Sequence, residues 1–121
     1  MTKIMMVDDD KLVIELLQKL LKADGFETVA TNDSSKAIEL AKQEKPDLLL
    51  LDLMMPQPDG FRLCRMLREE PLFTRTPIII VTALDDSDSR AVAFGAGATD
   101  YLTKPFHPGE LKDKILEALE S

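Results

Sequence analysis

Short apolar runs alternate along the whole chain with longer stretches in which apolar residues recur at helical spacing. Five runs are predicted to be strands, at residues 3–7, 27–31, 48–51, 78–82 and 100–102. Residues 48–51 (LLLL) and 78–81 (IIIV) are apolar at every position, as expected of strands buried on both faces of a parallel sheet. Strands that alternate with helices indicate an α/β fold, in which helices cover both faces of a parallel sheet.

The stretches between the strands have the pattern of amphipathic helices. In the first of them, the inner face is predicted to comprise Val13, Leu16, Leu17, Leu20 and Leu21. The polar residues expected to cap the helices are Asp10, Asp33 or Ser34, and Asp59. Pro108 stands where the last helix is expected to begin, because proline is favoured in the first turn.

The length of 121 residues favours a single domain, 1–121, with its own core. Five strands in such a chain suit a three-layer, flavodoxin-like sheet with strand order 2-1-3-4-5. The net charge of −7 argues against direct nucleic-acid binding, which needs a basic face. Cys64 is the only cysteine and is expected in the core. Without a transmembrane-length run or a signal-peptide layout, a cytoplasmic location is expected.

Polar residues stand where the predicted strands end. Asp8 and Asp9 follow the first strand, and Asp52 follows the third. Thr82 ends the fourth strand, and Lys104 follows the fifth. The carboxyl ends of parallel strands share one edge of the sheet, and ligands bind there at the point where the strand order reverses. We therefore expect these side chains to form one pocket.

The predicted pocket has the chemistry of a phosphoryl-accepting site. Carboxylates about 5 Å apart repel each other by roughly 3 kcal/mol per pair at an effective dielectric constant near 20, so a cluster of them needs a cation or a shared proton. Oxygen ligands favour a hard ion, which makes Mg²⁺ the expected cofactor and Mn²⁺ the alternative. Lys104 and Thr82 would contact a phosphoryl oxygen. Asp52 would be the nucleophile that forms an acyl phosphate.

Taken together, the chain resembles the receiver domain of bacterial two-component response regulators. The matching segments keep the order and spacing of the family: residues 6–10 (MVDDD), 51–56 (LDLMMP), 59–60 (DG), 81–83 (VTA) and 97–106 (GATDYLTKPF). They extend over nearly the whole chain. A single acidic pair would be weak evidence, whereas the set is highly specific.

The resemblance implies a role for each acidic residue of the set. Asp52 corresponds to the phospho-accepting aspartate. Asp52 and Asp9 correspond to direct Mg²⁺ ligands, and Asp8 to the acid that holds the ion largely through water. The backbone carbonyl of Met54 corresponds to a further ligand. Asp10 is not part of this set and is expected only to cap the first helix.

The resemblance also implies which residues respond to phosphorylation. Thr82 and Lys104 correspond to the pair that contacts the phosphoryl group. Thr82 and Tyr101 correspond to a switch pair, in which the hydroxyl moves toward the phosphate and the aromatic ring swings inward. The peptide bond between Lys104 and Pro105 is expected to be cis, as is usual in the family.

As a receiver, the protein would be a signalling switch and not a metabolic enzyme, catalysing only its own phosphorylation and dephosphorylation. The resemblance implies a sensor histidine kinase or a histidine phosphotransfer protein as the donor. It places the changing surface over residues 85–94, 100–102 and the last helix, where an output domain, a downstream protein or a second copy would bind. No membrane contact is expected.

Some positions vary across the family or depart from its common choices. Gln57-Pro58 replaces a more usual loop pair, and His107 stands where a Ser or Asp cap is frequent. By resemblance, Met54 and Leu84 tune how fast the acyl phosphate is lost. Both are apolar and neither side chain can position an attacking water, so a long phosphoryl lifetime is predicted.

Three alternative functions remain at this point. A Mg²⁺-dependent aspartyl-phosphate phosphohydrolase would need an acid two residues after the nucleophile, where Met54 stands, and a substrate cap. A flavodoxin would need a phosphate-binding loop after the first strand, where three aspartates stand. A degenerate receiver that acts only as a binding module is opposed by the completeness of the residue set.

Overall fold

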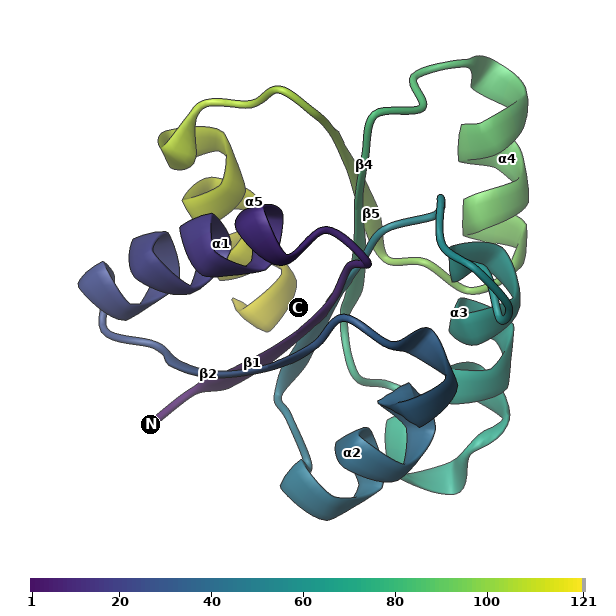
Figure 1. The fold of residues 1–121 in the computed structure, drawn as a ribbon, viewed down its shortest axis with the longest axis horizontal. Coiled ribbons are helices and arrows are strands. Elements are labelled where there is room, and N and C mark those ends of the chain that lie inside the picture. Colours follow the sequence, from purple (N-terminus) through teal and green to yellow (C-terminus); the bar gives the residue numbers. More distant parts are fainter. Residues whose placement is uncertain (121) are drawn as a thin grey trace.

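A parallel sheet with helices on both faces forms the centre of the protein (Figure 1). The computed structural model describes residues 1–120, and residue 121 of the expected domain 1–121 lies outside them. The strand order is β2-β1-β3-β4-β5, which confirms the predicted order 2-1-3-4-5. The strands are β1 (Lys3–Val7), β2 (Glu27–Thr31), β3 (Leu48–Leu51), β4 (Ile78–Thr82) and β5 (Asp100–Thr103).

The helices divide between the two faces of the sheet. α1 (Lys11–Ala23) and α5 (Pro108–Glu120) pack on one face, at the left of Figure 1. The other face carries α2 (Ala37–Glu44), α3 (Gly60–Glu69) and α4 (Ser87–Gly95). Short 3₁₀ turns precede α2 and follow α3, as η1 (Ser34–Lys36) and η2 (Pro71–Phe73).

The strand register brings the chemically important ends of the strands to one level. All neighbouring strands are parallel, and Val7 of β1 pairs with Leu51 of β3. Asp8 and Asp52 are the next residues after this pair, so they leave adjacent strands side by side. Thr82, the last residue of β4, pairs with Thr103 of β5.

Most of the side chains that were predicted to be buried lie in the core. All four leucines of β3 are buried, because helices cover the sheet on both sides. Leu16 contradicts the prediction, since its side chain is 55% exposed. The inner face of α1 uses Ile14 together with Leu17 and Leu21. Apolar residues surround more of α1 than the sheet can cover, which explains the error at Leu16.

Several local predictions are also confirmed. Asp10 and Asp59 cap α1 and α3, each accepting a backbone N–H bond of 2.9 Å. The Lys104–Pro105 peptide bond is cis, and so is Gln57–Pro58, which was not predicted. Cys64 is fully buried. Within residues 1–120, no helix has the length and apolar character needed to cross a membrane.

Of the two residues predicted as the cap of the second helix, Asp33 and Ser34, only Asp33 has a capping hydrogen bond. Asp33 accepts a 3.0 Å bond from the Ser35 backbone N–H at the start of η1. Ser34 is buried and has a different role, since its hydroxyl donates to the Pro56 carbonyl at 2.9 Å. This bond ties the loop that follows β3 to the segment after β2.

Candidate functional site

The carboxylates of Asp8, Asp9 and Asp52 lie together at the carboxyl edge of the sheet. Each offers one oxygen to a cluster whose oxygens are all within 4.8 Å of one another. Asp8 and Asp52 are nearly buried, at 3% and 8% exposure, whereas Asp9 is exposed. The structure thus brings together the acidic residues that the sequence predicted would meet.

Each buried carboxylate is fixed through both of its oxygens. Oδ1 of Asp8 accepts a 2.9 Å bond from the Asp10 backbone N–H, and Oδ1 of Asp52 accepts a 3.2 Å bond from that of Met54. The second oxygens, Oδ2, face Lys104, whose Nζ donates to Asp8 at 2.8 Å and to Asp52 at 3.1 Å. The ammonium group therefore bridges the ends of β1 and β3.

The ionisation of this cluster reflects competition between burial and pairing. Burial raises the pKa of Asp8, against the opposing effect of its hydrogen bond from Lys104. Burial would lower the pKa of Lys104, but its bonds to Asp8 and the charge of Asp52 outweigh burial and raise that pKa. Lys104 therefore remains a cation, and it faces a cluster of three carboxyl groups, two of which it contacts directly.

The donor set fits a hard divalent cation. All three candidate groups are carboxylates, and the only histidine and the only cysteine, His107 and Cys64, belong to other parts of the chain. Ligand oxygens on opposite sides of one Mg²⁺ are about 4 Å apart, close to the spread of this cluster. A divalent cation would also reduce the repulsion between these carboxyl groups. Asp8, Asp9 and Asp52 are the residues that would hold it.

Thr82 and Tyr101 are connected through the backbone of one residue. The Thr82 side chain is fully buried, and its Oγ1 accepts a 3.5 Å bond from the Leu84 N–H. The Tyr101 hydroxyl donates to the Leu84 carbonyl at 2.6 Å. Burial raises the pKa of Tyr101, against the positive charge of Arg90. Tyr101 is 3% exposed, and its ring already lies inward, the orientation that the resemblance associates with phosphorylation.

Gly60 sets the position of the Asp52 backbone. Its N–H donates to the Leu53 carbonyl at 3.1 Å. A Cβ atom at this position would overlap the carbonyl oxygen of Asp52 and lie 2.5 Å from the Cα of Leu53. The N-terminus of α3 therefore packs against the segment that carries Asp52. The sequence indicated a turn at Gly60 but gave no sign of this contact.

Arg90 is a second residue near the site that sequence reasoning missed. Its guanidinium carbon lies 4.5 Å from the centroid of the Tyr101 ring. Its Nη2 donates to the Thr103 hydroxyl at 3.0 Å. No motif or periodicity in the sequence identifies an arginine in the first turns of α4 as a partner of β5.

An apolar groove adjoins the acidic pocket. It has a volume of about 250 Å³ and is lined by α1 side chains, including Val13 and Leu16, and by the segment from Lys104 to Phe106. Lys104 belongs to both features, since it lines the groove and its ammonium contacts Asp52. The exposed side chain of Leu16 is thus part of a continuous apolar surface beside the pocket.

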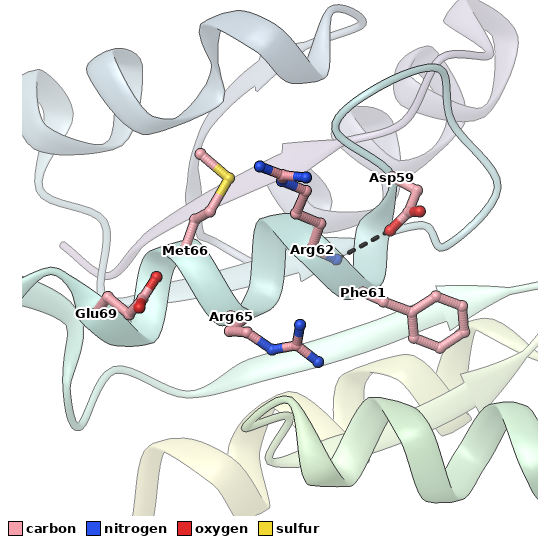
Figure 2. A pocket seen from close by; sticks show the side chains of 6 residues that line it. All are labelled: Asp59, Phe61, Arg62, Arg65, Met66 and Glu69. Atoms are coloured by element: carbon pink, nitrogen blue, oxygen red, sulfur yellow. Dashed lines mark hydrogen bonds between the residues drawn. The ribbon is translucent and has the colours of Figure 1, made fainter.

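Another hollow, of about 350 Å³, lies on the outer face of α3 (Figure 2). Arg62, Arg65 and Met66 line it, and Asp59 and Glu69 stand near its two ends. The Asp59 carboxylate is engaged in capping α3, as the dashed line in Figure 2 shows. None of the residues at the strand ends contributes to this hollow, so it is separate from the acidic pocket.

The sequence of this chain is similar to those of known response regulators, in agreement with the geometry of the acidic pocket. Residues 4–116 match the family model described as the response regulator receiver domain. The alkaline phosphatase synthesis transcriptional regulatory protein PhoP of Bacillus subtilis is 38% identical over 113 residues, which are 93% of this chain and 46% of that protein. The chain thus spans about half the length of the curated relatives it matches.

Solved structures share the complete fold. The BeF3-activated N-terminal receiver domain of Klebsiella pneumoniae RstA matches with a TM-score of 0.91 and 34% identity, covering 99% of this chain and 100% of that one. The receiver domain of the sensor histidine kinase PA1611 from Pseudomonas aeruginosa, with a magnesium ion coordinated in its active-site cleft, has a TM-score of 0.91 and 28% identity. That match covers 99% of this chain and 98% of the other.

Proposed function

The chain belongs to the response regulator receiver domain family, and on this premise we propose that residues 1–121 form one receiver domain, with Asp52 as its phospho-acceptor. The observation that carries this proposal is the position of Asp52 beside two further carboxylates and within 3.1 Å of the Lys104 ammonium. Phosphoryl transfer depends mainly on positioning and on neutralising charge, and this arrangement provides both.

The proposed reaction uses Asp52 as the nucleophile. One of its carboxylate oxygens forms a bond to phosphorus while the bond between phosphorus and the donor's histidine nitrogen breaks, and the imidazole leaves with the electron pair. Asp8, Asp9, Asp52 and the carbonyl of Met54 would hold Mg²⁺, or Mn²⁺ in its place. The ion would neutralise negative charge on the phosphoryl oxygens. The magnesium ion reported for the PA1611 receiver supports this assignment.

Lys104 and Thr82 would recognise the transferred group. Lys104 already contacts the Oδ2 atom of Asp52, so its ammonium can move to a phosphoryl oxygen without leaving the pocket. The Thr82 hydroxyl accepts a long bond of 3.5 Å from the Leu84 N–H, which makes it available as a donor to a phosphoryl oxygen. A reorientation of the Thr82 hydroxyl would alter the contacts of Tyr101, because the Leu84 backbone is hydrogen-bonded to both side chains.

The output surface would be the face formed by α4, β5 and α5. Val92 and Phe94 of α4 are 47% and 45% exposed, and Leu116 of α5 is 41% exposed. Phe94 lies 6.4 Å from the Tyr101 ring, measured between ring centroids, so the switch pair is linked to this surface through direct packing. An output domain, a downstream protein or a second copy of the chain would bind there. The greater length of the relatives supports an output domain.

A sensor histidine kinase or a histidine phosphotransfer protein would donate the phosphoryl group. The apolar groove between α1 and the segment after β5 adjoins Lys104, and Leu16 is exposed on it. A partner helix with an apolar stripe would bury this surface and bring a phosphohistidine on the same helix close to Asp52. The protein would then be a switch that catalyses only its own phosphorylation and dephosphorylation.

Intact-mass measurement tests this proposal without a cognate kinase. After incubation with Mg²⁺ and acetyl phosphate, the protein should gain one phosphoryl group, and a chelator should prevent the gain. Turnover of acetyl phosphate without any accumulated adduct would favour the phosphohydrolase alternative. The position two residues after Asp52 is occupied by the exposed Met54, which cannot act as the general acid that such an enzyme needs.

A further inference from the structure

Arg90 covers the ring of Tyr101 from α4. The guanidinium carbon is 4.5 Å from the ring centroid, within the range in which a cation is attracted to the face of an aromatic ring. The Nη2 donor of Arg90 also binds the Thr103 hydroxyl at 3.0 Å. The side chain is therefore held at two points on β5, one of them the ring itself.

The remaining contacts of Tyr101 define an inward orientation. Its hydroxyl donates to the carbonyl of Leu84 at 2.6 Å, and its ring faces Phe94 at a tilt of 38°. Arg90 is the charged side chain that lies over the ring in this orientation. An outward rotation of Tyr101 would break the hydroxyl bond and the contact with Arg90 together.

We propose that Arg90 is a latch that holds Tyr101 inward before phosphorylation. The inference deepens the proposed function, on which its regulatory meaning rests. A cation–aromatic contact of this kind shifts a two-state equilibrium by about twofold to thirtyfold, enough to decide which orientation predominates. Arg90 thus acts as a positioning residue for the switch, through Tyr101, and not as a catalytic residue.

The latch changes what phosphorylation has to do. Since Tyr101 is already inward, the phosphoryl group at Asp52 would act mainly on Thr82 and on the Leu84 backbone, whose N–H and C=O bind the two switch residues. The face of α4 and β5 would then be largely prearranged in the resting protein. Without the latch, the inward orientation of Tyr101 would depend on the phosphoryl group.

The composition of the chain allows a direct test. Tyr101 is the only tyrosine and there is no tryptophan, so tyrosine fluorescence reports on this ring alone. Acrylamide quenching of that fluorescence measures how accessible the ring is. We would compare the wild-type protein with Arg90→Gln, which removes the cation, and with Thr103→Val, which removes only the second anchor. Arg65→Gln makes the same change of charge at an exposed position of α3 and serves as the matched control.

The latch predicts a graded result in the unphosphorylated protein. The quenching constant should rise about threefold or more in Arg90→Gln and by a smaller factor in Thr103→Val, and should not change in Arg65→Gln. Arg90→Lys keeps the cation and should restore part of the protection. Equal quenching of the wild type and Arg90→Gln would overturn the proposal. Far-ultraviolet circular dichroism of each variant checks that the fold is retained.

Adding Mg²⁺ and acetyl phosphate separates the latch from the proposed function. In the wild type, quenching should change little, whereas in Arg90→Gln it should fall back toward the wild-type value as the adduct forms. Intact mass records the adduct in the same samples. Absence of an adduct would contradict the proposed function. The latch would still be tested by the quenching of the unphosphorylated wild type and Arg90→Gln. A large decrease in wild-type quenching on phosphorylation would contradict the latch alone.

Discussion

Lys104 and Asp8 are 96 positions apart in the sequence and form a 2.8 Å ion pair at the carboxyl edge of the sheet. The same ammonium group lies 3.1 Å from Asp52. One lysine from the loop after β5 thus holds the ends of β1 and β3 together electrostatically. It occupies the place where the proposed phosphoryl group would arrive, and it offsets only part of the carboxylate charge.

Replacing Lys104 by methionine should make the protein more dependent on Mg²⁺. Without the ammonium, the buried carboxylates lose a charged partner, and we expect stability without metal to fall by about 1–3 kcal/mol. Mg²⁺ affinity should rise about tenfold because a competing positive charge is gone. Thermal unfolding with and without Mg²⁺ measures both effects. Lys36→Met, at an exposed position, should show neither, and an unchanged response of Lys104→Met to Mg²⁺ would contradict this account.

Gly60→Ala should disturb the Asp52 segment. The new methyl group would meet the Asp52 carbonyl and the Leu53 Cα, both of which are backbone atoms that cannot move aside cheaply. We expect a loss of about 2–4 kcal/mol of stability and slower phosphorylation by acetyl phosphate. Gly109→Ala is the matched control, since its Cβ would meet no atom of residues 1–120 within 4 Å, and it should be neutral or stabilising by up to about 1 kcal/mol. Denaturant unfolding compares the two, and equal effects would refute the proposed contact.

Arg68 should be a major contributor to stability at the opposite edge of the sheet. Its Nε donates to the Gly97 carbonyl at 2.9 Å, and its Nη1 donates to those of Phe73 and Thr76 at 2.7 and 2.6 Å. Arg68→Met would leave these carbonyls without their donors and should cost about 2–4 kcal/mol. Chemical denaturation measures this cost. Arg65 lies in the same helix but its side chain is exposed, so Arg65→Met serves as the control and should change stability by less than about 0.5 kcal/mol.

The residues around the proposed acyl phosphate should set its lifetime. Met54 is 56% exposed and Leu84 is partly buried, and neither side chain can direct a water molecule at phosphorus. Met54→Gln and Leu84→Asn should therefore shorten the lifetime, by about tenfold or more where the new amide positions a water. The decay of the adduct after removal of acetyl phosphate measures this. Unchanged decay in both variants would refute the predicted role of these positions.

The sequence was sufficient for the strand order and for the assembly of the acidic pocket. Runs such as 48–51 leave no polar side for solvent, so they specify central strands of a parallel sheet. Once the sheet is parallel, topology alone brings Asp8, Asp52 and Lys104 to one edge. Each of the three residues comes directly after a strand, and this shared position explains why Lys104 contacts Asp8 at 2.8 Å and Asp52 at 3.1 Å.

Contacts that depend on how helices are rotated against the sheet could not be predicted in this way. Leu16 fits the apolar pattern of α1 but is exposed, because Ile14 faces the sheet instead. Gly60 and Arg90 act through close approaches between elements, to the Asp52 backbone and to the Tyr101 ring. Such approaches depend on helix position and rotamer, which leave no periodic signal in a single sequence.

The identity of the phospho-acceptor is the central claim, and chemical trapping tests it most directly. The protein is incubated with Mg²⁺ and acetyl phosphate, reduced with borohydride, digested and analysed by mass spectrometry. An acyl phosphate at Asp52 would be converted to homoserine at that position, and Asp52→Asn should show neither this conversion nor a phosphoryl adduct. A stable adduct on another residue, or an adduct of unchanged yield in Asp52→Asn, would contradict the assignment of Asp52.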